Sequence, residues 1–218
     1  MRPKEYTPPL GHAALTPLYD VAIRYLTREK AWRSALAEQI DLKPGDRLLD
    51  VGCGTGSLLI DLAKACPKAE LVGIDPDEQA LTAARAKARE AGVSIMFIPG
   101  FLENAELPDE WQPNKITSSL MFHQVPFAEK SKIVDLMRDF FVSKGELHIA
   151  DYALQKTWAM RTAFRMTVQS VDGVEDTQHN ADGILEQILV CEGFLTEKTK
   201  SFATLTGSIS LFRAVKIA

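Results

Sequence analysis

Residues 48–59 read LLDVGCGTGSLL, and this stretch decides the fold expected of the chain. Residues 47–51 have the apolar character of a short buried strand, and residues 57–65 have the character of a helix. Gly52, Gly54 and Gly56 lie between them. A turn out of a strand needs one glycine, so glycines on three alternate positions indicate that something other than protein approaches the backbone there.

Each glycine has an expected part in this bend. Gly52 would allow the sharp turn, whereas Gly54 and Gly56 would leave room at the start of the helix, where free N–H groups favour an anion. Asp75 ends a second predicted strand, 70–75, and a carboxylate there is the usual partner of two ribose hydroxyls. The glycine bend and Asp75 together predict a site for a nucleoside that carries a pyrophosphate or a carboxylate. Two cofactor families therefore remain open.

The composition limits the classes of protein that the chain could represent. The 218 residues are 46% hydrophobic and 25% charged, with a net charge of −4, which is typical of a soluble globular protein. No run of Lys or Arg indicates a nucleic-acid partner or a membrane-surface anchor, and no stretch resembles a secretory signal or a membrane span. Cys53, Cys66 and Cys191 form no C-x-x-C pair, so we expect no metal site, no disulfide framework and a cytoplasmic location.

Strand-like and helix-like stretches alternate along the chain, which is typical of an α/β sheet with crossover helices. Asp77 is expected to cap a helix over 78–91 that ends at Gly92. Two strands near the C-terminus are joined only by residues 204–207, which permits only an antiparallel hairpin. We therefore expect a mostly parallel sheet with one reversed strand near its edge and helices on both faces. The expected strands are 47–51, 70–75, 93–98, 116–121, 146–150, 198–203 and 208–215; the later helices are one with an apolar stripe at Ile133, Leu136, Met137, Phe140 and Phe141, and one over 180–191.

Two segments lie outside the alternation. Residues 1–45 are predicted to form a helical cap, and residues 152–179 form an insertion. In the insertion, one helical face is shared by Met160, Ala163, Phe164, Thr167, Val168 and Val171. Both segments are natural lids, because ligands of open α/β sheets lie beyond the carboxyl ends of the strands. A stripe of this kind is more often core than the wall of a lipophilic pocket. We expect a single domain over 1–218, made of the cap, a cofactor-binding core over 46–151, the insertion, and a C-terminal helix and hairpin over 180–218.

The motifs resemble those of class I S-adenosylmethionine-dependent methyltransferases, in particular the UbiE-like, type 11 group. LLDVGCGTG at 48–56 looks like their first motif, with G-x-G-x-G spacing where dinucleotide sites favour G-x-G-x-x-G. VGID at 72–75, SSLMFHQVP at 118–126 and VSKGELHIADY at 142–152 are similar to later segments, and the reversed hairpin is a family trait. The resemblance covers roughly residues 15–216. It implies a Rossmann-like seven-stranded sheet, with S-adenosylmethionine as cofactor and S-adenosylhomocysteine as product.

The resemblance also implies roles for individual residues. The glycine loop would hold the methionine part of the cofactor, Asp50 would lie near its amino group, and Asp75 would bind the ribose. Relatives often have Gly-Asp beside the adenine, but this chain has Gly100 and Phe101, so either Phe101 stacks on the ring or Glu103 supplies the acid. The expected cofactor contacts are Tyr19, Asp50, Gly52, Cys53, Gly54, Gly56, Asp75, Pro76, Asp77, Gly100, Phe101, Leu102, Glu103 and Ser119.

Candidates for the chemistry lie at the same edge of the predicted sheet. His123 follows the fourth strand, where it could act as a base or orient a substrate, or else cap or hydrogen-bond a neighbouring loop. Asp151 ends the fifth strand and could contact substrate, and Ser119 could line the methyl site or face a helix. Cys53 near a helix N-terminus could have a lowered thiol pKa, although a small residue filling a tight loop is the simpler interpretation. Tyr19 could close over the cofactor or simply pack.

Methyl transfer is an in-line displacement that depends mainly on holding donor and acceptor in line. An amine, a thiolate or an activated carbon needs no base, whereas a hydroxyl acceptor does. We expect a small-molecule methyltransferase with no metal, no nucleic-acid partner and no integral membrane segment; a lipophilic acceptor and a homodimer are left open. A quinone-ring C-methyltransferase is the alternative substrate class. A nicotinamide-dependent oxidoreductase and a non-catalytic cofactor-binding partner are the alternatives from other classes.

Overall fold

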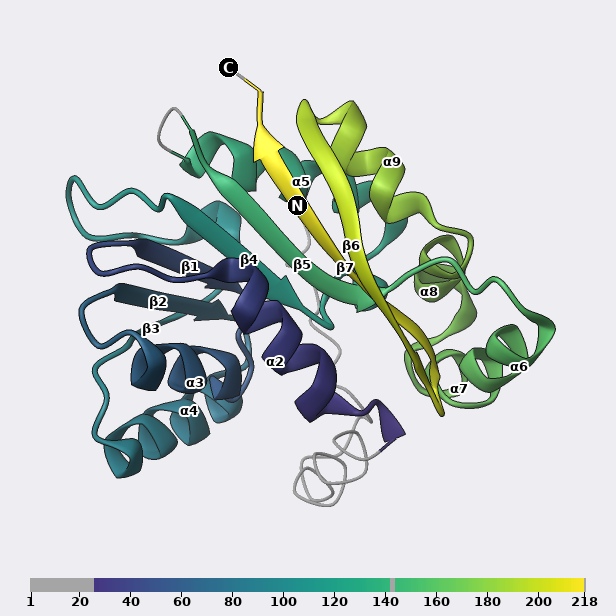
Figure 1. The fold of residues 1–218 in the computed structure, drawn as a ribbon, viewed down its shortest axis with the longest axis horizontal. Coiled ribbons are helices and arrows are strands. Elements are labelled where there is room, and N and C mark those ends of the chain that lie inside the picture. The colour runs from purple at the N-terminus through teal and green to yellow at the C-terminus, as the bar shows by residue number, and fades with distance from the viewer. Residues whose placement is uncertain (1–25, 142–143, 218) are drawn as a thin grey trace.

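The computed structural model of the chain describes residues 26–141 and 144–217. Its strands form one sheet in the order β3-β2-β1-β4-β5-β7-β6 (Figure 1). The first five strands are parallel, and β7 runs antiparallel to both of its neighbours. This confirms the predicted seven-stranded sheet with one reversed strand near its edge. The strands are β1 (Arg47–Val51), β2 (Glu70–Asp75), β3 (Met96–Pro99), β4 (Lys115–Ser119), β5 (Glu146–Tyr152), β6 (Phe194–Thr204) and β7 (Gly207–Lys216).

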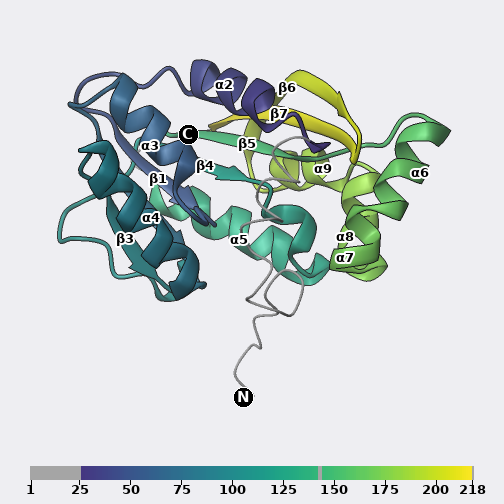
Figure 2. The ribbon, with the colours of Figure 1, turned by 90° about the horizontal axis from the view of Figure 1, so that it is seen from below.

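Helices cover both faces of the sheet. Helices α2 (Glu29–Ile40) and α3 (Ser57–Ala65) lie on one face, and α5 (Phe127–Phe140) and α9 (Ile184–Cys191) lie on the other (Figure 1 and Figure 2). Helix α4 (Glu78–Ala91) packs beside α3. The helices of the insertion lie beyond the end of β5 (Figure 1). They are α6 (Trp158–Met166), α7 (Val168–Asp172) and α8 (Val174–Ala181). Elsewhere in the chain, the short 3₁₀ helix η2 (Leu102–Asn104) follows β3, and η3 (Phe122–Gln124) follows β4.

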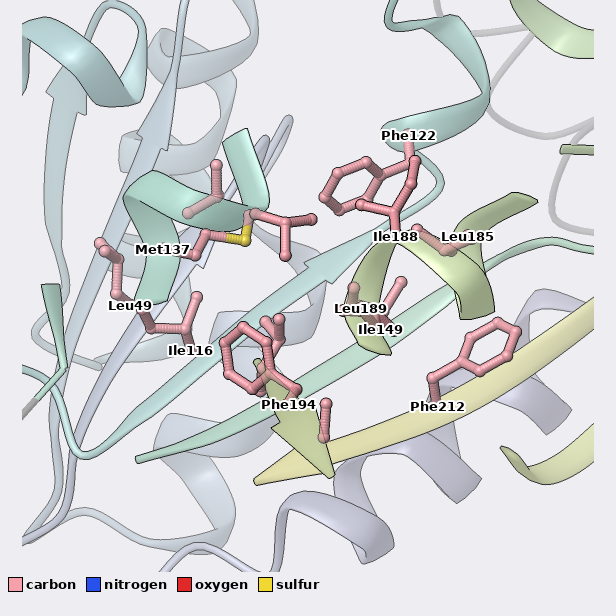
Figure 3. Close-up of a cluster of buried hydrophobic side chains, with 14 of the residues drawn as sticks. Leu49, Ile116, Phe122, Met137, Ile149, Leu185, Ile188, Leu189, Phe194 and Phe212 are labelled. Atoms are coloured by element: carbon pink, nitrogen blue, oxygen red, sulfur yellow. The ribbon is translucent and has the colours of Figure 1, made fainter. Parts of the chain in front are cut away.

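The alternation of side chains along β1 divides the apolar core into two parts. Leu48 belongs to the cluster under α2 and α3, and its neighbour Leu49 belongs to the cluster under α5 and α9. Figure 3 shows the second cluster, in which Leu49 and Ile116 from the sheet meet Met137 from α5. The sheet is therefore buried on both sides, as expected for parallel strands.

Helix α5 turns a slightly different stripe toward the sheet from the one predicted. Val134 and Met137 are fully buried, and Ile133, Leu136 and Phe140 are only partly buried against the same cluster. The buried stripe extends backward to Lys130, one turn before Val134. A lysine therefore occupies a position that helical spacing reserves for an apolar residue.

Several predicted elements differ in extent; the strand predicted over 198–203, for example, begins at Phe194 as β6. The helix predicted over 180–191 is broken, because α8 ends at Ala181 and Gly183 takes a left-handed φ of +88° before α9 begins. The strand predicted over 93–98 begins at Met96, the first residue of β3 that pairs with β2, its one neighbour in the sheet. The apolar face of the insertion is also divided, since α6 ends at Met166 and α7 begins at Val168.

The stripe of the insertion belongs mainly to the core. Phe164 and Val168 are buried in the cluster that α2 and α3 also share. Val171, which we placed on the same face, is 42% exposed. The interpretation of this stripe as core therefore holds for its two central residues.

The predicted N-terminal cap is described only from residue 26 onward. Within it, α2 packs across β5 and β7, and Trp32, Leu36 and Ile40 are buried there. The expectations for Tyr19 and for a lid formed by the first residues lie outside the described part of the chain. None of the helices described is long and apolar enough to cross a membrane.

Candidate active site

The bend between β1 and α3 is built from left-handed glycines. Gly52, Gly54 and Gly56 have φ values of +74°, +52° and +70°. A Cβ at Gly52 would lie 2.7 Å from Cγ of Met121, and one at Gly56 would lie 3.0 Å from Cζ of Phe97. A Cβ at Gly54 would meet nothing within 4 Å. The outer glycines are therefore needed for packing, and Gly54 is the point at which the backbone faces open space.

Asp75 is joined to this bend by hydrogen bonds. Its Oδ2 accepts from the N–H of Gly54 at 2.7 Å, and its Oδ1 accepts from the N–H of Asp77 at 2.9 Å. Asp77 in turn caps α4 by accepting from the N–H groups of Gln79 and Ala80, as predicted. Burial raises the pKa of Asp75, and the two backbone N–H groups partly oppose that effect. The carboxylate expected to grip a ribose thus lies directly against the open turn of the loop.

Asp50 carries a buried acceptor that lacks a partner. Its side chain is 1% exposed, and Oδ1 has no hydrogen bond. Burial, and to a smaller extent the nearby Asp75, raises the pKa of Asp50 to about 8, while Arg33 acts in the opposite direction. An unsatisfied carboxyl oxygen is costly in a folded protein unless a ligand completes it. Its chemistry fits a cationic hydrogen-bond donor, such as the α-ammonium group of an amino acid.

The start of α3 is suited to the opposite charge. Gly56 is its N-cap residue, and no side chain caps the first N–H groups. Nζ of Lys87 lies close by and donates to Oγ1 of Thr55 at 2.7 Å and to Oγ of Ser57 at 3.4 Å. The bend therefore places a buried carboxyl group and an electropositive helix start near each other, as the two charges of an amino acid require.

A broad groove of about 1200 Å³ adjoins this region but is separate from it. It lies between α2, α3 and α4, and its lining includes Ser57 and Lys87 at one end. None of its lining residues is a glycine of the bend, Asp50 or Asp75. The unpartnered acceptor of Asp50 and the open backbone at Gly54 coincide at the carboxyl edge of the sheet, and not in the groove.

The segment after β3 combines an open backbone position with exposed and buried side chains. Gly100 has φ +125° with open space in front of it, and Phe101 and Glu103 are exposed. Leu102 is 5% exposed and belongs to the core cluster of α5. Its side chain faces the interior, so only its backbone is available to a ligand. Stacking by Phe101 and an acid supplied by Glu103 both stay predictions for this segment.

Cys53 lies in the loop as a packing residue. A Cβ at Gly73 of β2 would lie 2.7 Å from its sulfur, so the thiol fills the space above that glycine. Burial, with the carboxylates of Asp50 and Asp75 adding to it, raises the pKa of Cys53 far above its usual range. The thiol is therefore not a nucleophile at neutral pH.

His123 lies in η3 and is enclosed between two carboxylates. Nδ1 is 2.8 Å from Oδ1 of Asp151, and Nε2 is 3.6 Å from Oδ2 of Asp172 in α7. Its ring also meets Tyr152 edge-on, at 4.9 Å between centroids. Burial works against the charged form, but Asp151 and then Asp172 outweigh it and raise the pKa of His123 to about 9. The ring is consequently an imidazolium at neutral pH and has no free lone pair.

Both carboxylate oxygens of Asp151 accept hydrogen bonds from protein donors. Besides His123, it accepts from the N–H groups of Phe122 and Tyr152, both at 2.7 Å. Ser119, the last residue of β4, is half-buried beside Ala150 of β5. The structure thus brings His123 and Asp151 together in one buried cluster at the carboxyl edge, next to the strand that ends at Ser119.

Sequence reasoning missed two members of this cluster. Asp172 lies in the insertion, where no pattern pointed to a partner. Lys130 is fully buried on α5 and donates to three backbone carbonyl groups. A signal for Lys130 was present, because it lies at i, i+4 and i+7 spacing with Val134 and Met137 on the buried stripe.

Comparisons with known proteins agree with this architecture. A family model described as a methyltransferase domain matches residues 48–145. The demethylmenaquinone methyltransferase of Deinococcus radiodurans is 29% identical over 161 residues, which are 73% of this chain and 66% of that protein. The ubiquinone/menaquinone biosynthesis C-methyltransferase of Syntrophotalea carbinolica is 33% identical over 111 residues, which are 50% of this chain and 46% of that protein. The matches thus span less than two thirds of the length of these relatives.

A solved structure shows the same fold over most of the chain. Magnesium protoporphyrin IX methyltransferase from Synechocystis, with bound S-adenosylhomocysteine, superimposes with a TM-score of 0.69. The sequences are 23% identical, and the match covers 91% of this chain and 86% of that one. At this identity the likeness shows the fold alone.

The sheet order, the reversed β7 and the glycine bend beside Asp75 define a Rossmann-like fold with its glycine bend at the carboxyl edge of the sheet. The family match over residues 48–145 and the relatives support a place among the class I S-adenosylmethionine-dependent methyltransferases, and the solved structure agrees in fold. S-adenosylmethionine is the cofactor of that class.

Proposed function

We propose that the protein transfers a methyl group from S-adenosylmethionine to a small-molecule acceptor by in-line displacement. One observation carries the proposal. The buried Oδ1 of Asp50 lacks a partner beside a bend whose backbone is open at Gly54, and Asp75 lies one strand away. An ammonium group, a carboxylate and a ribose require this set of groups in this order.

The cofactor supplies an electrophilic methyl group on a positively charged sulfur. The residues of this chain bind and orient it: Asp50 would accept from the α-ammonium group, the N-terminus of α3 would face the carboxylate, and Asp75 would accept from the ribose hydroxyls. Holding donor and acceptor in line is worth roughly 7–11 kcal/mol of the barrier in well-aligned systems. Binding and alignment therefore account for a large part of the catalysis.

The charge on His123 bears on the class of acceptor. An imidazolium between Asp151 and Asp172 cannot take a proton from a hydroxyl group, so we assign His123 to holding η3 in place and not to general-base catalysis. The acceptor atom would then be one that needs no protein base, such as an amine, a thiolate or an activated carbon. Ser119, at the end of β4, is our candidate for lining the methyl site.

A quinone-ring carbon is a second candidate acceptor. The two curated relatives described above act on demethylmenaquinone or take part in ubiquinone and menaquinone biosynthesis by C-methylation, according to their names. An activated ring carbon also suits a site without a base.

We further propose a single domain, supported by one sheet that contains strands from β1 to β7, and a cytoplasmic location, supported by the unpaired cysteines. A lipophilic acceptor would follow from the quinone candidate; a homodimer stays a hypothesis.

Thermal-shift measurements test the cofactor directly. We expect S-adenosylmethionine and S-adenosylhomocysteine to raise the melting temperature, whereas NADH and NADPH should leave it unchanged. Stabilisation by the nicotinamides alone would replace the proposal by an oxidoreductase. A mass-based product screen with labelled S-adenosylmethionine and a small-molecule cell extract would then identify the acceptor. Cofactor binding without any labelled product would favour a non-catalytic partner.

A further inference from the structure

Lys130 connects two parts of the molecule that are far apart in sequence. Its side chain is fully buried, and Nζ donates to the carbonyl oxygens of Phe122 at 2.5 Å, Val125 at 2.7 Å and Asp176 at 3.1 Å. The first two belong to the segment after β4, and the third belongs to α8 of the insertion. One ammonium group therefore holds the post-β4 segment and the insertion together.

The post-β4 segment leads directly to the glycine bend. Met121 precedes Phe122, and its side chain covers Gly52 so closely that a Cβ there would lie 2.7 Å from it. Phe122 is itself held from the other side, because its N–H donates to Oδ2 of Asp151 at 2.7 Å and its ring is buried beside α9 (Figure 3). A shift of the Phe122 carbonyl would therefore displace Met121 against the bend.

We propose that Lys130 is a positioning residue for the cofactor site, which holds Met121 against Gly52 and couples the bend to α8 of the insertion. The proposal rests on the proposed function, because the bend is taken to be the site of S-adenosylmethionine. Lys130 itself touches neither cofactor nor substrate in this scheme. It acts through the backbone of Phe122 and Val125.

The charge of the lysine matters to this arrangement. An ammonium group has three N–H donors for the three carbonyl groups, whereas a neutral amine has two. Burial lowers the pKa of Lys130 to about 8, although Asp151 and Asp176 favour the charged form. The other charged groups of the cluster are His123, which faces Asp151, and Asp172 in α7. Above about pH 8 one carbonyl group loses its donor, and the two segments should separate more easily.

Binding and hydrogen exchange of the full chain test the proposal. S-adenosylhomocysteine is the probe, with its dissociation constant measured by calorimetry at pH 7. The variant Lys130→Met keeps the approximate length of the side chain and removes its three N–H donors. The matched control is Lys132→Met, two positions further along α5, where the lysine side chain is 66% exposed. We expect about tenfold weaker binding for Lys130→Met, partial recovery for Lys130→Arg, and no change for Lys132→Met. Amides of 121–125 and 174–181 should exchange faster in Lys130→Met alone.

The outcomes separate the two proposals. Wild-type protein that does not bind S-adenosylhomocysteine would overturn the proposed function. Wild-type protein that binds it, with Lys130→Met matching Lys132→Met in affinity and exchange, would overturn the role of Lys130. If Lys130→Met does not fold, hydrogen exchange of the wild-type protein provides the test. After correction for intrinsic exchange rates, the protection of amides 121–125 should fall between pH 7 and pH 8.5. Constant protection over this range would reject the proposal.

Discussion

Nδ1 of His123 lies 2.8 Å from Oδ1 of Asp151, and neither side chain is open to solvent. The pair joins η3 to the end of β5. Asp172, on the other side of the imidazole ring, connects the same histidine to the insertion. A histidine between two carboxylates keeps its proton, so the pair acts as an ionic joint at the edge where the chemistry is expected. Its presence makes stability depend on pH in a defined direction.

Replacing His123 should remove a pH-dependent part of the stability. Because the pKa of His123 is raised from 6.5 to about 9, its contribution is fully present below pH 6.5 and is lost as the pH rises through 9. A shift of this size corresponds to up to about 3 kcal/mol. In urea titrations, the difference in unfolding free energy between wild type and His123→Asn should be large at pH 6 and shrink by pH 9. A difference that is constant over this range would show that the ring is not an imidazolium.

Asp50 should couple cofactor binding to proton release. Its pKa in the folded protein is raised to about 8, so the free protein holds a proton there at pH 7, and a cationic ligand group would displace it. Binding of S-adenosylhomocysteine should tighten as the pH rises toward 8, and calorimetry in buffers of different ionisation enthalpy should detect the released proton.

Asp50→Asn provides the matching variant. A carboxyl group whose pKa is raised on folding penalises the folded state at every pH above its unfolded value, so the amide should raise the melting temperature of the free protein. The same variant should bind the ligand at least tenfold more weakly, with no proton release. Unchanged affinity would place the ammonium group elsewhere.

Gly54 should be needed for binding more than for folding. It has φ +52° and open space where a Cβ would lie, and Gly92 after α4 has φ +67° and equally open space. Alanine at either position should cost about 1 kcal/mol of backbone strain. Only Gly54→Ala should abolish binding of S-adenosylhomocysteine, since only there does a ligand approach the backbone. Equal affinities for the two variants would contradict the assignment of the bend.

Asp75→Ala should weaken cofactor binding by more than tenfold. The change removes the acceptor of the ribose hydroxyls and also the acceptor of the Gly54 N–H. Asp75→Asn, which keeps the size of the side chain, separates the two effects, and Asp61→Ala on the exposed side of α3 is the control. Wild-type affinity in Asp75→Ala, measured by calorimetry, would remove Asp75 from the site.

The parts of the fold that follow from local rules were predictable from the sequence. The glycine bend, the Asp77 cap and the reversed hairpin each depend on residues that are close in sequence. The extent of β3 depended on pairing with β2, and the division of α8 from α9 depended on a backbone angle at Gly183, and neither is visible in an apolar pattern.

The residues of the candidate site show the same difference between local and long-range determinants. Asp50, Gly54 and Asp75 were identifiable because they lie at the ends of strands with recognisable patterns. Asp172 and Lys130 were not, because the apolar stripe of the insertion does not mark Asp172 as a partner of His123, and Lys130 resembled an ordinary surface lysine until its stripe was known to be buried. Contacts between distant segments depend on how the insertion packs, which local patterns do not encode.

The reversed β7 has a consequence for the order of folding. It fills the place between β5 and β6, so β5 pairs with residues about sixty positions later in the chain, as in Ile149 with Phe212. A nascent chain that has emerged only as far as β6 leaves one side of β5 with unpaired N–H and C=O groups. Synthesis of 207–216 therefore closes the most exposed interior edge of the sheet, and a ribosome that pauses before this segment would hold a chain prone to association with its neighbours.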